Sequence, residues 1–293
     1  MLNPNPNMLL RIAQGDAYGM ATEYIKLPRD QTVYDQALEF TQYCKHPTHN
    51  LMPGQYTDDT QMSIAVAEVL LGDEHTRPMF ADAFVRCFKR DQRDGYARHF
   101  QAFLESVVDV HDFLARINPA SDKNGAAMRS VPIGVLSNPN QVIEVAQTQA
   151  KLTHDTLGGI ASSIFVSLMS HFALYRDEPF SNLPAWLEKV YPILVLKPWP
   201  GGRIAAPDVG LKTASAVLRL LIDGRNLIDI AKTTIEWGGD TDSVLAIAWG
   251  IASARMREPL PEFFEHGLER GPYGYNFLAK LGETLMMRYS DSK

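Results

Sequence analysis

Residues 57–71 read TDDTQMSIAVAEVLL, two adjacent carboxylates set between threonines and followed by an apolar run. A run of this kind is typical of a buried helix. Carboxylates are stabilised in the first turn of a helix, where unpaired backbone N–H groups and the macrodipole favour negative charge. The stretch therefore predicts a buried helix over residues 60–71 with Asp58 and Asp59 at its N-terminus.

A near-copy of this pattern stands much later in the chain, at Gly238-Gly239-Asp240-Thr241-Asp242-Ser243, directly before the apolar run 244–252. Taken alone, either motif is also explained as an acidic helix cap. Two such helix starts, each anchored by an apolar helix, favour a single site, because buried carboxylates in this number need cations to stay ionised. Oxygen donors suit Mg²⁺ or Mn²⁺. We therefore expect a pair of divalent ions between the two motifs.

The remaining sequence predicts an all-α protein, because helical spacing of apolar residues recurs and no sustained two-residue alternation suggests strands. Neither a fixed-period repeat nor a shift in composition marks a boundary, so we expect a single domain over residues 1–293. Long loops are expected over residues 28–53 and 118–140, and Gly15 and Gly19 are expected to loosen the first helix. The expected helices cover residues 8–20, 60–71, 78–90, 100–117, 141–152, 157–175, 184–196, 212–223, 227–236 and from 244 on, with two more within 261–288, and residues 197–208 form a connector.

Composition narrows the possible partners and compartment. The 293-residue chain is 45% apolar, carries a formal net charge of −6, and has a pI near 5.8, which argues against a nucleic-acid scaffold. The two cysteines, Cys44 and Cys87, are too few for a disulfide framework. Apolar windows shorter than a membrane span and an N-terminus without a signal-peptide pattern lead us to expect a cytoplasmic protein that does not enter a membrane. Cys44, His46 and His49 form a second possible metal group, against which Pro47 and the open polar loop argue.

Five motifs span most of the chain. They are Gly15-Asp16-Ala17-Tyr18-Gly19, Tyr56-Thr57-Asp58-Asp59-Thr60-Gln61-Met62, Asn124-Gly125-Ala126-Ala127-Met128-Arg129 with Pro132-Ile133-Gly134, Thr153-His154, and the stretch from Gly238 to Ser243. Taken together and in this order, they resemble the ADP-ribosylglycohydrolase family, which includes the dinitrogenase reductase activating glycohydrolase and the ADP-ribosylhydrolases.

The resemblance implies an orthogonal bundle of helices with a binuclear Mg²⁺ or Mn²⁺ centre. Matched motif to motif, it implies six metal ligands: Thr57, Asp58, Asp59, Asp240, Asp242 and Ser243. Many family members have Thr in place of Ser243, and the hydroxyl is kept. Glu23 stands where the family carries an acidic residue on a flap near the metals; without the family it reads as a solvated loop glutamate.

The resemblance also implies a substrate site. The loop with Asn124, Gly125, Ala126 and Met128 corresponds to the family's substrate-binding stretch, whose backbone N–H groups approach the diphosphate and ribose. His154 corresponds to a histidine that reaches the bound ADP-ribose, although Asp155-Thr156-Leu157 depart from the family's usual continuation and a lone His between helices is often structural. Aromatic residues that can stack on adenine, or can simply fix loops, are Trp199, Tyr273 and Tyr275.

The function implied is hydrolysis of the C1″ glycosidic bond that joins ADP-ribose to a protein side chain or a small molecule. Catalytic roles then fall to Asp59 or Asp242 as the base or bridging group and to Glu23 as a gate and proton carrier. Two alternatives stay open: a non-catalytic ADP-ribose-binding or structural relative, and a two-metal phosphoesterase. The acceptor and the oligomeric state are not indicated by the sequence.

Overall fold

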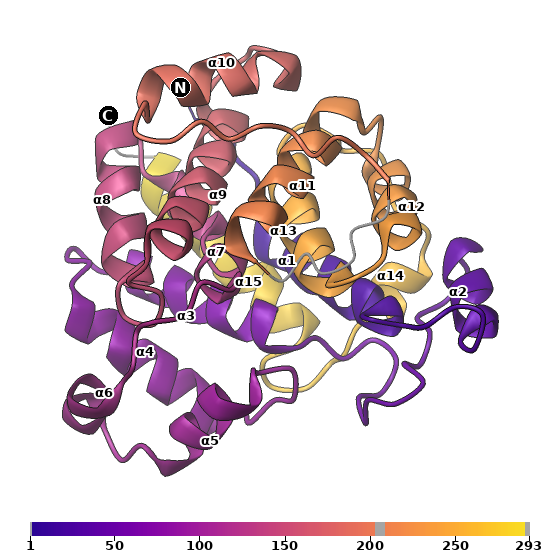
Figure 1. The fold of residues 1–293 in the computed structure, drawn as a ribbon, viewed down its shortest axis with the longest axis horizontal. Helices are drawn as coiled ribbons and strands as arrows, with labels where there is room; N and C mark the ends of the chain where they lie inside the picture. Colours follow the sequence, from indigo (N-terminus) through magenta and orange to yellow (C-terminus); the bar gives the residue numbers. More distant parts are fainter. Residues whose placement is uncertain (1, 203–208, 291–293) are drawn as a thin grey trace.

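The chain folds into a helical molecule in a computed structural model that describes residues 2–202 and 209–290 (Figure 1). Within these ranges, fifteen α-helices and three short 3-10 helices form the regular structure, and no β-strand is present. The prediction of an all-α fold is confirmed. Two isolated backbone bridges, Ala120 with His154 and Lys123 with Val209, join loops near one end of α9.

The helices follow one another along the chain, and the irregular segment 39–57 separates α2 from α3. The first half contains α1 (Met8–Gly19), η1 (Met20–Thr22), α2 (Gln31–Leu38), α3 (Asp58–Leu70), α4 (Arg77–Arg90), α5 (Arg98–Ser106), α6 (Val110–Arg116), α7 (Gly125–Met128) and η2 (Val131–Val135). The second half contains α8 (Pro139–Ala150), α9 (Leu157–Tyr175), η3 (Phe180–Asn182), α10 (Leu183–Val190), α11 (Gly210–Asp223), α12 (Leu227–Trp237), α13 (Thr241–Ala252), α14 (Phe263–His266) and α15 (Tyr275–Ser290).

The packing of α1 against α13 in the middle of the molecule brings residues 8–19 beside residues 241–252 (Figure 1). Glycines on both helices allow this close approach. A Cβ atom on Gly15 would lie 2.7 Å from the Leu245 carbonyl oxygen, and one on Gly250 would lie 2.6 Å from Ile12 Cγ1. The prediction that Gly15 and Gly19 loosen the first helix is therefore wrong, because α1 is continuous and its glycines make room for a neighbouring helix.

The most apolar long helix, α9, lies in the core. It has 19 residues and a mean hydropathy of 1.6, so by length and composition it is able to cross a membrane. However, 83% of the 18-residue stretch that has this hydropathy is buried inside the molecule. There α9 packs against α8, α11 and α13. A buried core helix accounts for the apolar run.

Three predicted segments differ from the structure. Residues 100–117 form two helices, α5 and α6, because Val107 is extended and the Asp109 side chain caps a new helix by accepting from Asp112 N at 2.9 Å. The expected loop 118–140 contains α7 and η2, and the helix expected over 184–196 ends at Val190. Of the expected connector 197–208, residues 203–208 lie outside the described residues.

Candidate active site

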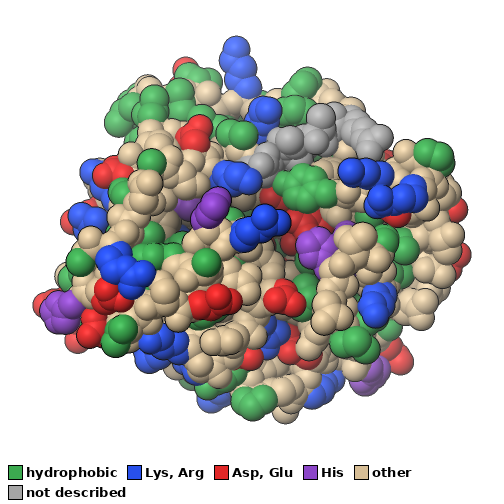
Figure 2. Space-filling model, turned by 60° about the horizontal axis from the view of Figure 1, so that its bottom comes forward, with side chains coloured by type: hydrophobic (Ala, Val, Ile, Leu, Met, Phe, Trp, Pro, Cys, Tyr) green, Lys and Arg blue, Asp and Glu red, His purple; other side chains and the backbone are tan. Residues whose placement is uncertain are grey.

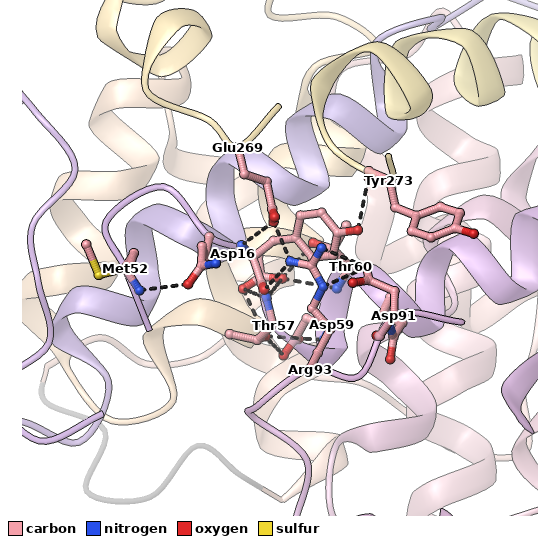
Figure 3. A network of polar contacts seen from close by, with 12 residues as sticks. Asp16, Met52, Thr57, Asp59, Thr60, Asp91, Arg93, Glu269 and Tyr273 are labelled. Carbon is pink, nitrogen blue, oxygen red and sulfur yellow. Dashed lines mark hydrogen bonds and ion pairs between the residues drawn. The ribbon is translucent and has the colours of Figure 1, made fainter. Parts of the chain in front are cut away.

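The first acidic motif lies at the start of α3, where Thr57 is the N-cap residue and its hydroxyl oxygen accepts from Asp59 N at 3.3 Å. A buried carboxylate on α1, that of Asp16, orients this turn (Figure 3). It accepts hydrogen bonds from the backbone N–H and the hydroxyl of both Thr57 and Thr60, at 2.6–3.1 Å. Asp16 thereby fixes the direction in which α3 presents its first-turn carboxylates.

Arg93 secures the segment that leads into this motif (Figure 3). Its guanidinium lies 3.8 Å from the centre of the Tyr56 ring, donates to the Tyr56 carbonyl at 3.2 Å, and pairs with the Glu269 carboxylate. Glu269 also accepts from Tyr56 N at 3.2 Å. Arg93 and Glu269 therefore fix both the ring and the backbone of Tyr56, the residue before Thr57.

The second acidic motif lies at the start of α13. Gly238 and Gly239 have φ values of +67° and +88°, a conformation that favours glycine, and they turn the chain from α12 into α13. Thr241 Oγ1 then donates to the Gly19 carbonyl at 2.7 Å. A Cβ atom on Gly19 would lie 2.6 Å from the Asp242 Cα atom, so the end of α1 contacts the backbone of this motif directly.

The two motifs meet at one cavity of about 760 Å³, whose wall includes Asp58, Asp59, Asp240, Asp242 and Ser243. Figure 2 shows a hollow with acidic side chains inside it and Lys, Arg and His side chains around its edge. Burial, and then the charges of neighbouring carboxylates, raises the pKa of Asp58, Asp59 and Asp242 well above the ordinary value. Several carboxyl groups thus lie close enough together to oppose one another's ionisation.

Two carboxylate oxygens of this cluster bear on whether the site suits a metal ion. Asp59 Oδ1 and Asp242 Oδ1 are buried and have no hydrogen-bond partner in the described part of the chain. Carboxylate oxygens of Glu23, Asp240 and Asp242 also lie within 4.8 Å of one another. Unpaired buried oxygens of this kind are stabilised by a cation, and an all-oxygen set suits Mg²⁺ or Mn²⁺. The residues present therefore fit a divalent metal centre.

Glu23 reaches this cluster from the segment after η1. Tyr24 N donates to the Gly239 carbonyl at 2.8 Å, which joins the segment to the second acidic motif. Burial, followed by the charges of Asp240, Asp58 and Asp16, raises the pKa of Glu23 to about 8. The structure thus brings the Glu23 carboxylate beside those of Asp240 and Asp242.

His46 and His49 support Glu23 rather than form a metal site with Cys44. His46 Nε2 lies 2.9 Å from the Glu23 carbonyl oxygen, and His46 Nδ1 accepts from His49 N at 3.0 Å. His49 Nε2 lies 3.6 Å from Glu23 Oε2. Sequence reasoning missed this role, because the histidines lie more than twenty positions from Glu23 in a polar loop with no recognisable period.

The segment around α7 forms another wall of the cavity, with Asn124, Gly125 and Met128 among its lining residues. Asn124 Nδ2 donates to Asp240 Oδ2 at 3.0 Å, so this segment touches the second acidic motif. His154 faces the same cavity beside Gly125. The cavity thus joins acidic residues from three separate segments to the residues expected to hold a substrate.

Comparison with known proteins agrees with this arrangement. The profile of the ADP-ribosylglycohydrolase family matches residues 7–292. The chain belongs to this family. An uncharacterized protein of Archaeoglobus fulgidus is 26% identical over 309 aligned residues, which cover 96% of each chain. The ADP-ribosylarginine hydrolase Tri1 of Serratia proteamaculans is 22% identical over 264 aligned residues, which cover 84% of this chain and 69% of that protein.

A solved structure supports the same fold. A chain of an ADP-ribosylglycohydrolase-related protein complex superimposes with a TM-score of 0.73 and 21% sequence identity, covering 97% of both chains. At this identity the likeness concerns the fold. The ADP-ribosylglycohydrolase family membership suggests a hydrolase that removes ADP-ribose.

Some residues implied by the family resemblance lie outside the cavity wall. Thr57 is fully buried and its hydroxyl donates to Asp16 Oδ1 at 2.9 Å, while the Ala126 carbonyl accepts from Ser130 and Gln149 behind the wall. The aromatic candidates Trp199, Tyr273 and Tyr275 do not line the cavity either. Instead, the cavity wall also includes Arg98, Phe100 and Phe103 of α5, Arg116 of α6, and Lys123.

Proposed function

We propose that this member of the family is a metal-dependent hydrolase that cleaves the C1″ glycosidic bond between ADP-ribose and its acceptor. The observation that carries the proposal is the pair of unpartnered buried oxygens, Asp59 Oδ1 and Asp242 Oδ1, in the acidic end of the cavity. They suit two divalent ions, Mg²⁺ or Mn²⁺, with Asp58, Asp240 and Ser243 completing the set. When bound, such ions neutralise the carboxylates and polarise oxygen atoms of substrate and water.

The part of the cavity wall that comes from α5 and α6 suits the rest of the ligand. It includes the cationic side chains of Arg98 and Arg116 and the rings of Phe100 and Phe103. Cationic groups favour a diphosphate, and aromatic rings favour a nucleobase. An ADP-ribosyl group placed with its terminal ribose at the acidic end therefore meets side chains of complementary chemistry along its length.

Three groups of the chain suit the proton transfers that the hydrolysis requires. Glu23 suits proton transfer because its carboxylate oxygens lie beside those of Asp240 and Asp242, and burial raises its pKa. Asp59 or Asp242 suits the acceptance of a proton from the attacking water, because each has one oxygen without a protein partner. Asn124, bonded to Asp240, keeps the substrate loop beside these groups.

The test is a panel of acceptors carrying ADP-ribose on arginine, on serine or on a nucleobase, incubated with Mg²⁺, Mn²⁺ or EDTA. We expect free ADP-ribose from at least one acceptor, only when metal is present. The substitutions Asp59→Asn and Asp242→Asn should each reduce the rate by about 100-fold, whereas Asp223→Asn, on the surface end of α11, should leave it unchanged.

Other products would point elsewhere. Release of a cleaved phosphate would indicate a phosphoesterase, and tight binding of ADP-ribose without turnover of any acceptor would indicate a non-catalytic relative. Normal release by the Asp242→Asn variant would overturn the assignment of this site.

A further inference from the structure

A buried polar network lies behind the substrate-binding wall and centres on Arg129. This side chain is only 1% exposed, and no carboxylate in the described part of the chain forms an ion pair with it. Its guanidinium donates to the side chain of Gln149, to the Gln149 carbonyl at 3.2 Å and to Thr153 Oγ1 at 2.8 Å, and it lies 4.4 Å from the centre of the Phe84 ring. Burying a cation among neutral acceptors costs free energy, which indicates that Arg129 has a role besides stability.

Arg129 sets the direction of its hydrogen bond to Thr153. Arginine has donors only, so Thr153 Oγ1 must accept from Arg129. The same oxygen lies 2.7 Å from His154 Nδ1. Accepting from Arg129 leaves the hydroxyl with one more lone pair and with its own proton, and His154 Nδ1 is its remaining partner in the described structure. The arrangement that gives this proton an acceptor is the one in which Thr153 donates to Nδ1, which places the proton of the neutral imidazole on Nε2.

The other ring nitrogen of His154 faces the cavity. The ring lies over Gly125, where a Cβ atom would be 2.9 Å from His154 Cε1 and 3.1 Å from His154 Nε2. His154 lines the cavity, and no protein acceptor bonds to its Nε2 within the described residues. A ring held at one nitrogen and unpartnered at the other presents an N–H donor toward a ligand.

We propose that Arg129 and Thr153 are positioning residues that hold His154 as its Nε2–H tautomer, a fixed neutral donor to an oxygen atom of the ADP-ribosyl group. The identity of that ligand rests on the proposed function, whereas the tautomer does not. Burial, and then the charge of Arg129, lowers the pKa of His154 to about 3, which agrees with a neutral ring. With its proton on Nε2, His154 recognises an acceptor atom and is not a base for the hydrolysis.

The same network ties the donor to the substrate loop. Gln149 Oε1 accepts from Arg129, while Gln149 Nε2 donates to the Ala126 carbonyl at 3.1 Å. Ala126 belongs to α7, whose first residue, Gly125, contacts the His154 ring. One buried guanidinium therefore sets both the orientation of α7 and the tautomer of the histidine beside it.

The tautomer is tested directly by NMR of the metal-free protein labelled with ¹⁵N at histidine, with His154 assigned by its loss in His154→Ala. We expect a protonated Nε2 and an unprotonated Nδ1 in the wild type and in Thr153→Ser, which keeps the hydroxyl. Thr153→Val should give a mixture of tautomers. A wild-type ring protonated on Nδ1 would overturn the proposal.

The role in binding is tested by calorimetric titration with ADP-ribose, in EDTA and in Mg²⁺. We expect Thr153→Val to weaken binding about 10-fold and Thr153→Ser to bind within about twofold of the wild type. In the His154→Ala background, Thr153→Val should have almost no further effect, because Thr153 acts through the ring. A matched control is Thr234→Val, which removes another buried threonine hydroxyl, in α12 and outside the cavity wall.

The outcomes separate this inference from the proposed function. Full additivity of Thr153→Val and His154→Ala, in proteins with native circular dichroism, would overturn the positioning role. If Thr153→Val does not fold, the tautomer of His154 in the wild type and the affinity of Thr153→Ser for ADP-ribose still test the proposal. If the wild type shows the Nε2–H tautomer but fails to bind ADP-ribose, the ligand assignment and the proposed function fail together, while the tautomer stands.

Discussion

The carboxylate of Asp16 and the threonine Thr57 are joined by three contacts: Thr57 N lies 3.1 Å from Oδ1 and 3.0 Å from Oδ2, and Thr57 Oγ1 lies 2.9 Å from Oδ1. Asp16 is fully buried, and within the described residues its hydrogen-bond donors are Thr57 and Thr60 at the start of α3. It thereby acts as an N-terminal cap supplied by a different helix. The position of Asp58 and Asp59 depends on this contact.

We predict that Asp16→Asn lowers the free energy of unfolding by about 2 kcal/mol, because an amide nitrogen would face backbone donors that now have a carboxylate oxygen. The variant should also bind Mg²⁺ or Mn²⁺ more weakly. Denaturant unfolding and calorimetric metal titration measure the two effects. Asp35→Asn, on the exposed surface of α2, is the control, and unchanged metal affinity in Asp16→Asn would contradict the orienting role.

The contact between Gly19 and the second acidic motif leads to another prediction. A Cβ atom at Gly19 would lie 2.5 Å from the Thr241 carbonyl oxygen and 2.7 Å from Asp242 N, both backbone atoms that cannot move without shifting α13. Gly19→Ala should therefore destabilise the protein by about 1–3 kcal/mol and weaken metal binding. Gly271→Ala, where a Cβ atom would meet nothing within 4 Å, should change neither property.

Much of this fold follows from local patterns, because each helix with a clear apolar face needs only its own residues to be recognised. The starts of α3 and α13, with their adjacent carboxylates, belong to this class. Local patterns do not show which residues of another helix pack against a given helix. Gly15 and Gly19 were expected to weaken a helix, and only the presence of α13 beside α1 explains them.

The same distinction applies to the site. The acidic residues of the proposed metal centre are concentrated in two short motifs, so residue type and spacing are enough to propose them. The residues that orient the site are scattered: Asp16 acts on α3, His46 acts on Glu23, and Arg129 acts on His154 through Thr153. Each of these side chains reads as an ordinary polar residue until the fold brings its partner within hydrogen-bonding distance.

His46 gives a prediction about the segment that carries Glu23. Its Nε2 atom carries the proton, since Nδ1 accepts from the backbone N–H groups of Thr48 and His49, and it donates to the Glu23 carbonyl. We expect His46→Ala to lower kcat about 10-fold with little change in the Kd of ADP-ribose, because Glu23 would lose its orientation while the rest of the cavity remains.

His46→Gln, which keeps a side-chain N–H donor, should recover part of the rate. His111→Ala, an exposed histidine on α6, should behave as the wild type. An equal loss of rate in the alanine and glutamine variants would show that the hydrogen bond to Glu23 is not the cause.

The unpartnered oxygen of Asp242 predicts opposite effects of one substitution with and without metal. In EDTA, Asp242→Asn should be at least as stable as the wild type, because it removes one of several carboxyl groups that oppose each other's ionisation. In Mg²⁺ or Mn²⁺, the wild type should gain thermal stability and the variant should gain much less. Thermal unfolding measures both. A wild-type Tm that is the same in EDTA and in excess metal would argue against a metal centre here.

The raised pKa values predict how stability depends on pH when metal is removed. The pKa of Glu23 rises from 4.5 to about 8 in the folded protein, and that of Asp16 from 3.8 to about 6, in both cases mainly through burial. Between the ordinary and the raised values the folded state binds more protons than the unfolded state. Stability supplied by these protonated groups is therefore complete below about pH 4 and is lost as the pH rises toward 8.

In EDTA, the Tm should accordingly fall between pH 5 and pH 8. Bound metal should offset this loss, because it requires ionised carboxylates and so binds more tightly at higher pH. The difference between the Tm in Mg²⁺ and the Tm in EDTA should then widen across the same range. Glu23→Gln should reduce the slope of the EDTA curve between about pH 6 and pH 8, because Glu23 is one of the groups whose raised pKa lies near this range. A Tm in EDTA that is constant or rises from pH 5 to pH 8 would mean that these buried carboxyl groups do not hold protons in the folded state.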